Sequence, residues 1–467
     1  MNAGTLSVSS SPSYVDLSTS PCFPPIGDQG SLYSCVAFAS TYYQYSYEVN
    51  KLNGVTSASD RVIYSPKWTY NLSNFGSDNG TSLSYAYTML KQFGCLKLSD
   101  LPYDDDYLWI PGNTNLNANE MIAERMEALE TRVSDVGTCS IAANGTVING
   151  PNSSALRLVK QLLNSGKVLT ITTNAKYNYK NGRDRNGNII KVNYRAYSGG
   201  GGHAMAVVGY DDNVWCDVNG NGIAEECEKG AFKLANSYGI PGGVNDTNGF
   251  RWVLYDALNK VSANTVNSWE NNLSGARVCA FNGDNQTFWY INVEKKNVNF
   301  VGEIDLDVTQ LFENSFQNGR APVSNSNVNY NGSMWINSRA AYKGKLLFDY
   351  DNYCAPISQY LSGYDWYVKF SKLNGVYNFK MVDNFENIIK EYGAKNSNLT
   401  KKVNVSLIYG DVDYSGGLTM NDAYIIQQYV LGYRQFSNLQ NVIGDTNQDG
   451  EINLADSVLI QQLIIKH

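Results

Sequence analysis

Three common features are missing from this sequence, and each absence excludes a class of protein. No apolar run approaches the roughly 20 residues that a membrane-spanning helix needs, so we expect no membrane insertion. The formal net charge of -7 argues against nucleic acid as a partner. None of the eight cysteines has the paired spacing of zinc ligands.

Charge and histidine are scarce as well. Charged side chains make up 17% of the chain, which is rich in Tyr, Asn, Ser and Gly, as suits a secreted bacterial protein from an oxidising compartment. The first twenty residues have neither a basic n-region nor an apolar h-region. We therefore expect that a signal peptide has been removed or never belonged to this sequence, and that no inhibitory propeptide fits before Tyr14.

What the chain does have is length. Its 467 residues are too many for one hydrophobic core, so two or three domains are expected. We expect the protein to be a monomer.

One cysteine stands where a nucleophile would stand. Cys35 follows Ser34 at the start of a helical pattern, and the N-terminus of a helix stabilises a thiolate. Gln29, six residues earlier, can donate a hydrogen bond to an oxyanion beside the sulfur. A thiolate also needs a base, and the chain has only two histidines, His203 and the last residue.

Four blocks in this order resemble the papain-type cysteine peptidases over residues 1–272. They are 13–17, 29–38 with Gln29 and Cys35, 203–210 with His203, and 236–239 with Asn236, the last followed by 249–252. The resemblance implies Cys35 as nucleophile, His203 as base, Asn236 as orienter of the imidazole and Gln29 in the oxyanion hole. It also implies a protein or peptide substrate.

The chain departs from that family at three positions. Val36 and Tyr238 stand where the family usually has Trp, and Leu32 stands where it has a disulfide cysteine. None of these changes removes a catalytic group, and Tyr238 can still shield the His–Asn hydrogen bond. The alternative is a catalytically inactive or inhibitory papain-like module.

The pattern along the chain predicts three domains. Helical spacing predicts helices over 34–52, 80–93, 121–133 and 155–163. Strands are then predicted over 168–172, 204–210, 231–235 and 250–254. This is an α+β papain-like peptidase domain over 1–272, with Cys35 on one wall of a cleft and His203 and Asn236 on the other.

The chain after residue 272 has a different sequence pattern. Alternating residues separated by Asn/Gly/Ser-rich turns predict an all-β sandwich-like domain over 273–404, with strands over 287–293, 346–350 and 366–370. Its aromatic residues favour core packing over a glycan-binding face. With Cys35 reserved, the remaining cysteines suggest the pairs Cys216–Cys227, Cys279–Cys354 and Cys22–Cys95, although sequence does not fix connectivity.

The last domain, over 405–467, contains a duplicated loop and helix. The segments 411–422 and 445–456 align with an offset of 34 residues, and helices are predicted over 423–428 and 457–462. The expected calcium ligands follow EF-hand positions and are Asp411, Asp413, Ser415, Gly417, Asp422, Asp445, Asn447, Asp449, Glu451 and Asp456.

This repeat resembles a type I dockerin, a small α-helical calcium-binding module. The resemblance implies two structural Ca²⁺ ions and a scaffoldin cohesin as partner, and so a cellulosome-associated protein outside the cell. The residue pairs before the last ligand differ between the copies, Met420-Asn421 and Leu454-Ala455, which argues against symmetric dual binding.

A third loop with this spacing lies inside the first domain, over 217–228. Its expected ligands for one more structural Ca²⁺ are Asp217, Asn219, Asn221, Ile223 and Glu228. Because it is a single copy, an ordinary polar turn is the alternative.

Overall fold

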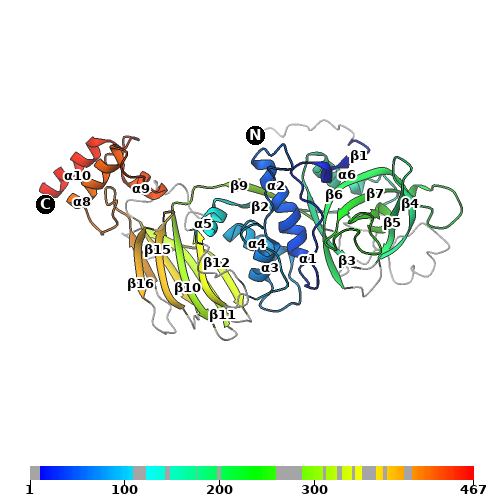
Figure 1. Cartoon of the computed structure of the whole chain (residues 1–467), viewed down its shortest axis with the longest axis horizontal. Helices are drawn as coiled ribbons and strands as arrows, with labels where there is room; N and C mark the ends of the chain where they lie inside the picture. The colour runs from blue at the N-terminus through cyan, green and yellow to red at the C-terminus, as the bar shows by residue number, and fades with distance from the viewer. Residues whose placement is uncertain are drawn as a thin grey trace.

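The computed structural model describes residues 11–108, 122–141, 148–175, 177–196, 201–258, 287–308, 312–322, 329–338, 342–349, 364–371, 376–385, 387–393 and 402–466. Figure 1 shows three parts in a row: helices with a large sheet, then a pair of sheets, then a small helical part at the C-terminus. Among the described residues, no helix combines the length and the apolar character needed to cross a membrane.

The helix predicted over 34–52 is one helical segment with a π-helical centre. It consists of α1 (Cys35–Ala37), η2 (Phe38–Tyr45) and α2 (Ser46–Leu52). The chain leaves it at Gly54, whose φ of 69° is the left-handed conformation that favours glycine after a helix. All residues of η2 are buried, so this segment is the core of the helical half.

The other helices of the first half agree with the pattern in part. α4 (Leu83–Phe93) begins after the N-cap Ser82 and ends before Gly94. The helix predicted over 121–133 stops earlier, because 131–133 already pair as the start of a strand. The remaining helices are α3 (Pro66–Ser73), which no apolar repeat predicts, α5 (Ile122–Glu130) and α6 (Arg157–Asn164).

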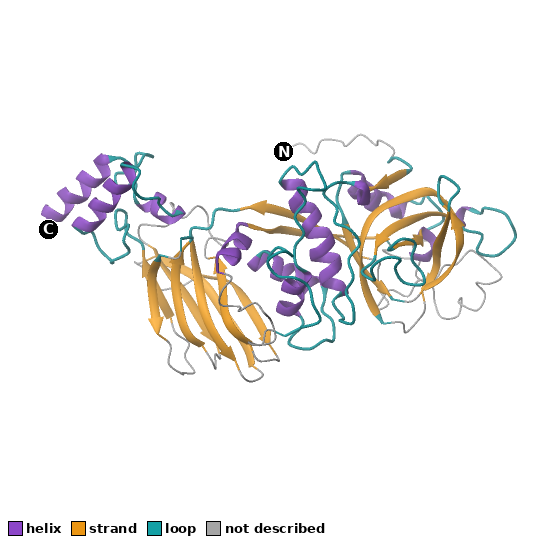
Figure 2. Ribbon diagram, viewed as in Figure 1, coloured by secondary structure: helices purple, strands orange, loops and turns teal. Residues whose placement is uncertain are grey.

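Nine described strands form the large sheet. They are β1 (Tyr14–Asp16), β2 (Thr131–Ser140), β3 (Leu169–Asn174), β4 (Tyr177–Arg183), β5 (Ile189–Ala196), β6 (Gly202–Trp215), β7 (Lys229–Ala235), β8 (Phe250–Leu254) and β9 (Thr287–Lys295). The order is β2-β9-β3-β6-β4-β5-β8-β7, and β6 also pairs with β7 and β1. The β6–β7 pairing closes five strands into a small barrel, seen at the right of Figure 2.

The four strands predicted between 168 and 254 are confirmed as parts of β3, β6, β7 and β8. The pattern misses β2, β4 and β5, whose polar residues hide the alternation. The strand predicted over 287–293 is present as β9, but it pairs with β2 and β3. The first sheet therefore extends past residue 272, because β9 returns and lies between β2 and β3.

The second part contains two four-stranded antiparallel sheets, as predicted. One has the order β13-β10-β15-β16 and the other β12-β11-β14-β17. The strands are β10 (Phe300–Val308), β11 (Phe312–Pro322), β12 (Asn329–Ser338), β13 (Tyr342–Asp349), β14 (Tyr364–Ser371), β15 (Val376–Asp383), β16 (Ile388–Gly393) and β17 (Lys402–Ser406).

The third part contains α8 (Met420–Val430), α9 (Asn438–Ile443) and α10 (Leu454–Lys466). The helices predicted at 423–428 and 457–462 lie within α8 and α10. This part rests on the β15–β16 turn, where Tyr414 Oη donates to Asp383 Oδ2 at 2.8 Å.

The predicted disulfides do not form among the described cysteines. Cys22, Cys95, Cys216 and Cys227 are all free thiols. Cys22 and Cys95 lie in different hydrophobic clusters, and each sulfur contacts backbone carbonyl oxygens instead. The pair Cys279–Cys354 lies outside the described residues.

A buried ion pair joins the first two parts. Arg132 of β2 pairs with Asp349 of β13, and their side chains are 1% and 0% exposed. Nε and Nη1 of Arg132 have no hydrogen-bond partner among the described residues. Asp349 therefore offsets much of the desolvation cost of burying the Arg132 guanidinium.

Asp349→Ala is expected to lower the free energy of unfolding by about 3–5 kcal/mol, because it leaves Arg132 buried without its anion. Guanidinium titration of the full chain measures the loss. Glu127→Ala, which breaks the half-exposed Lys97–Glu127 pair, is the control and should cost at most about 1 kcal/mol. Equal effects of the two substitutions would contradict the assigned role of Asp349.

Candidate active site and calcium loops

Cys35 is the first residue of α1, as the sequence predicts. Ser34 occupies the N-cap position but its side chain does not cap the helix, and its Oγ lies 2.7 Å from Tyr103 Oη instead. The side chain of Ser34 therefore does not compete for the amide groups that begin this helix. They remain available to stabilise negative charge near the Cys35 sulfur.

Gln29 is buried beside the same helix start. Its Oε1 accepts a hydrogen bond from Ser237 Oγ at 2.6 Å, and its Nε2 donates to Leu32 O at 2.7 Å. An amide nitrogen carries two hydrogens, so one remains for a substrate oxygen. The Ser237 contact ties Gln29 to the residue that follows Asn236.

His203 and Asn236 are brought together by the pairing of β6 with β7. His203 Nε2 lies 2.7 Å from Asn236 Oδ1, and both side chains are buried. The ring of Tyr238 stacks on the imidazole with centroids 4.9 Å apart. Tyrosine thus covers this hydrogen bond in the place where the resembled family has Trp.

Two residues that the sequence pattern does not reveal continue this chain of contacts. Asn236 Nδ2 donates to Asp246 Oδ2 at 2.7 Å, and Arg251 Nε donates to Asp246 Oδ1 at 2.8 Å. Both side chains of this ion pair are buried, at 0% and 2% exposure. No motif marks Asp246, which lies in the loop between β7 and β8.

Cys35 lies beside the backbone of Ala204, the residue after His203. No hydrogen bond joins its sulfur to the imidazole in the described structure. Burial raises the pKa of the Cys35 thiol. Burial, aided by Arg251, lowers the pKa of His203 to about 4. Each shift opposes the charged form of the residue concerned.

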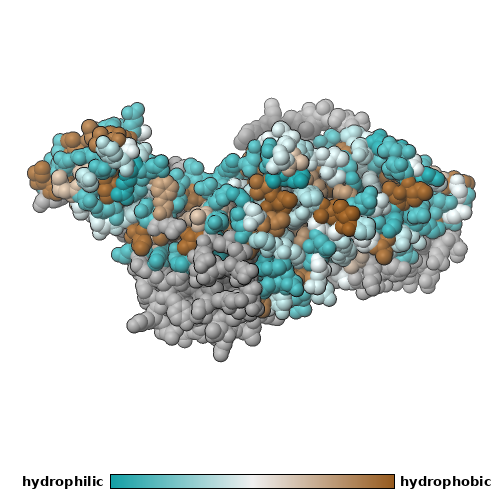
Figure 3. Space-filling model, viewed as in Figure 1, coloured by the Kyte–Doolittle hydropathy of each residue, from teal (hydrophilic) through white to brown (hydrophobic). Residues whose placement is uncertain are grey.

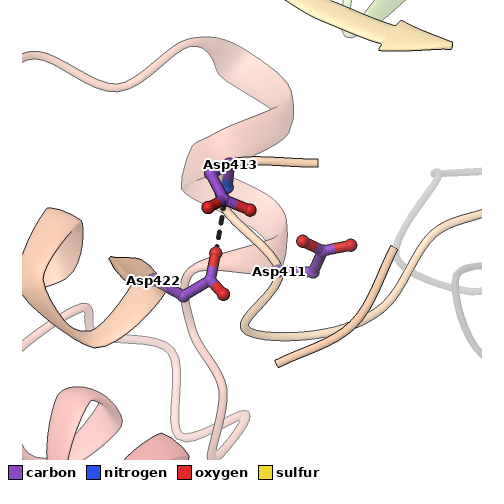
Figure 4. A group of neighbouring side chains, drawn as sticks. All are labelled: Asp411, Asp413 and Asp422. Carbon is purple, nitrogen blue, oxygen red and sulfur yellow. Dashed lines mark hydrogen bonds between the residues drawn. The ribbon is translucent and has the colours of Figure 1, made fainter. Parts of the chain in front are cut away.

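The carboxylates of the first C-terminal loop converge as predicted. Oxygens of Asp411, Asp413 and Asp422 all lie within 4.8 Å of one another, the one such group found among the described residues (Figure 4). Burial, with Asp422 and Asp413 nearby, raises the pKa of Asp411 to about 6. Clustered, half-dehydrated oxygens of this kind fit a hard cation such as Ca²⁺.

All three predicted loops share one hydrogen-bond pattern. The amide of loop position 6 donates to the position 1 carboxylate, as in Gly416→Asp411 at 3.0 Å, Gly450→Asp445 at 2.9 Å and Gly222→Asp217 at 2.9 Å. The position 5 amide donates to the position 3 side chain in Ser415→Asp413, Asp449→Asn447 and Asn221→Asn219. The loop over 217–228 is therefore folded like the two C-terminal loops.

The last predicted ligand of each loop turns inward. Asp422 accepts from Asp413 N at 3.0 Å, and Asp456 accepts from Asn447 N at 3.1 Å. In the third loop Glu228 accepts from Val218 N at 2.5 Å.

Glu225, which the sequence pattern does not single out, accepts hydrogen bonds from the side chains of Asn219 and Asn221. Burial and this neighbour raise the pKa of Glu228 to about 7. Backbone carbonyls are the predicted ligand atoms at position 7, at Gly417, Glu451 and Ile223.

A cavity of about 390 Å³ lies elsewhere, where all three parts of the chain meet. Its lining includes Glu124, Glu130, Lys296, Asn384 and Asn438. Neither Cys35 nor His203 lines it, so it is separate from the candidate active site.

The depressed pKa of His203 predicts a loss of stability in acid. Between its ordinary value of 6.5 and the folded value of about 4, the unfolded chain binds a proton that the folded chain does not. Lowering the pH from 7 to 4 should therefore destabilise the wild type by up to about 3 kcal/mol more than His203→Gln.

Urea titrations at several pH values measure this difference, with His467→Gln as the control that removes the other histidine. If His203→Gln and the wild type lose stability in parallel, the folded imidazole is charged and this expectation is wrong.

Comparison with known proteins gives three findings. A search of curated proteins finds no match to this sequence. Xylellain, a cysteine protease from Xylella fastidiosa, is a similar solved structure, with 18% identity and a TM-score of 0.37, covering 60% of this chain and 86% of that one. The cysteine protease and lectin-like domains of Cwp84, a surface layer associated protein of Clostridium difficile, are similar at 17% identity and a TM-score of 0.41, covering 75% and 73%.

Both solved structures are described as cysteine proteases or as containing a cysteine protease domain. Residues 409–465 match the family model of the dockerin type I domain. The prediction from the repeat is confirmed, and the C-terminal segment of this chain is a dockerin type I domain.

Proposed function

We propose that this protein is a secreted cysteine-type endopeptidase that hydrolyses peptide bonds through Cys35, His203 and Asn236. The observation that carries the proposal is the 2.7 Å contact between His203 Nε2 and Asn236 Oδ1, buried beneath Tyr238. This contact leaves His203 Nδ1 as the free ring nitrogen. Cys35, which lies beside the backbone of Ala204, begins a helix whose N-cap residue makes no side-chain cap hydrogen bond.

The reaction divides into two halves. Cys35 Sγ gives its proton to His203 and attacks the peptide carbonyl carbon, and the imidazolium then protonates the leaving amine. Water attacks the resulting thioester, with His203 as base, and releases the acid. Gln29 Nε2 and the Cys35 backbone N–H stabilise the oxyanion in both halves. Because burial opposes either charge alone, the thiolate of Cys35 and the imidazolium of His203 form as a pair.

The competing function is a catalytically inactive or inhibitory papain-like module. The partly buried position of Cys35, which raises the pKa of its thiol, favours this function. A peptidyl epoxide directed at the active site separates the two. Rapid, saturable labelling of Cys35 supports the enzyme, whereas labelling at the rate of free cysteine supports the inactive module.

Cys35→Ala should abolish peptide hydrolysis and leave the fold intact, because only the nucleophile is removed. Asn236→Ala should lose less activity than His203→Ala, since orienting a base contributes less than transferring the proton. Steady-state kinetics on a peptide library measure both effects. Cys35→Ala activity within about tenfold of wild type would reject the mechanism, and the reverse order would reject the role of Asn236.

The dockerin domain supports attachment to a scaffoldin cohesin in a cellulosome, outside the cell. Apolar side chains of its two long helices reach the surface at one end of the molecule (Figure 3), among them Met420, Tyr424, Leu454 and Val458. Such an exposed apolar set is typical of a binding surface.

Calcium is proposed to be structural in this protein. In the dockerin, two ions would be held by the ligands predicted for the loops over 411–422 and 445–456. A third would be held by Asp217, Asn219, Asn221, Glu228 and the carbonyl of Ile223. This third loop leads directly into β7, the strand that ends one residue before Asn236. An ion in the loop would therefore stabilise the strand that positions Asn236.

Calcium removal should affect the two ends of the chain differently. EDTA is expected to abolish cohesin binding, because the dockerin carboxylates repel one another without a cation. Labelling of Cys35 should persist, but the thermal midpoint of the peptidase part should fall. Cohesin pull-down and differential scanning calorimetry of the full chain measure these effects.

Variants that change a single loop show which calcium site is responsible for each effect of EDTA. Asp411→Ala should weaken cohesin binding alone, whereas Asp217→Ala should remove the calcium dependence of the peptidase midpoint alone. Asp60→Asn, an exposed aspartate outside all three loops, is the control. Cohesin binding that survives EDTA unchanged would reject the dockerin calcium sites.

A further inference from the structure

We propose that Asp246 is a positioning residue that fixes the amide orientation of Asn236 and, through it, the tautomer of His203. The inference rests on the proposed peptidase function, because it concerns how the base of that reaction is prepared. Asp246 is not itself a group that reacts with the substrate.

The two ends of the Asn236 side chain face different partners. Nδ2 donates to Asp246 Oδ2 at 2.7 Å, and Oδ1 lies 2.7 Å from His203 Nε2. A carboxylate only accepts hydrogen bonds, so the donor end of the amide must face Asp246. Ser237 N donates to Oδ1 at 2.9 Å and favours the same orientation.

This orientation determines which ring nitrogen carries the hydrogen. Because Asn236 Oδ1 is an acceptor, His203 Nε2 must be the donor. In the neutral imidazole Nδ1 is then unprotonated and can take a proton from the thiol. A reversed amide would present N–H to Nε2, move the ring hydrogen to Nδ1 and block that transfer.

Asp246 is held in place from two sides. Arg251 Nε donates to its Oδ1 at 2.8 Å, and Gly243 N donates to its Oδ2 at 2.9 Å. Arg251 is anchored in turn by the carbonyl oxygen of Ala175 at 3.1 Å. Rotation of the Asp246 carboxylate would break the buried ion pair, which is costly, so the acceptor facing Asn236 is fixed.

The pair also balances the charge around the imidazole. Asp246 raises the pKa of His203, whereas Arg251 lowers it. Other titratable groups on this side include Tyr238, stacked on the ring, Cys35, which lies near Tyr238, and Asp28, whose backbone pairs with that of Tyr238. The carboxylate can therefore orient the amide without leaving His203 permanently protonated.

A double-mutant cycle tests this role. Asp246→Asn has the same shape but offers Asn236 both a donor and an acceptor. We expect kcat to fall by about 10- to 100-fold with KM within about twofold. In an Asn236→Ala background, Asp246→Asn should cost at most about a further twofold, because Asp246 acts through Asn236.

Two further variants serve as controls for this double-mutant cycle. Asp246→Asn with Arg251→Met removes both buried charges, and should show the same loss of kcat if the single variant does not fold. Asp16→Asn removes another ion pair of the same sheet, with Lys233, and should leave kcat unchanged. An unchanged kcat for Asp246→Asn, or an equal loss in both Asn236 backgrounds, would overturn the inference.

Nitrogen NMR of the imidazole gives a readout that needs no substrate. With His467→Gln, His203 is the single histidine of the chain. We expect its Nε2–H tautomer in that background, and a second population with Nδ1–H after Asp246→Asn. An unchanged Nε2–H tautomer overturns the inference. If the wild type cleaves no peptide, the peptidase proposal fails, and the spectrum alone decides the role of Asp246.

Discussion

The buried helical segment from Cys35 to Leu52 is the element on which the first domain depends. Its polar side chains are paired with segments far along the chain. Tyr43 donates to Asn236 O at 2.6 Å and accepts from Gly27 N at 3.0 Å. Gln44 donates to the carbonyl oxygens of Val168 and Trp289. Because a buried polar group without a partner is costly, these bonds fix the helix relative to both the Gln29 loop and the sheet.

The candidate active site is a consequence of that placement. The helix brings Cys35 against β6, and the β6–β7 pairing brings Asn236 beside His203. His203 and Asp246 are buried, so a charge on either side chain needs a partner. Asp246 and Arg251 form one such pair, with Arg251 Nε donating to Asp246 Oδ1 at 2.8 Å.

One loop geometry serves two parts of the chain. The dockerin uses it twice, before α8 and α10, where a small module has little apolar core of its own. The first domain uses it once, between β6 and β7, in a region already held by the barrel. The same local hydrogen bonds therefore have different structural roles. In the dockerin they bring the carboxylates of one loop together, and in the barrel they set the conformation of the loop that connects two strands.

The sequence by itself determined what depends on short-range order. The helix at Cys35, the strands around His203 and Asn236, and the calcium-loop spacing could all be predicted, because local patterns and fixed spacings encode them. Tertiary structure decided the rest. Only long-range pairing returns β9 to the first sheet, places Cys22 and Cys95 in different hydrophobic clusters and brings Asp246 within hydrogen-bond distance of Asn236. Such contacts depend on where distant segments meet, and no local pattern of residues records that.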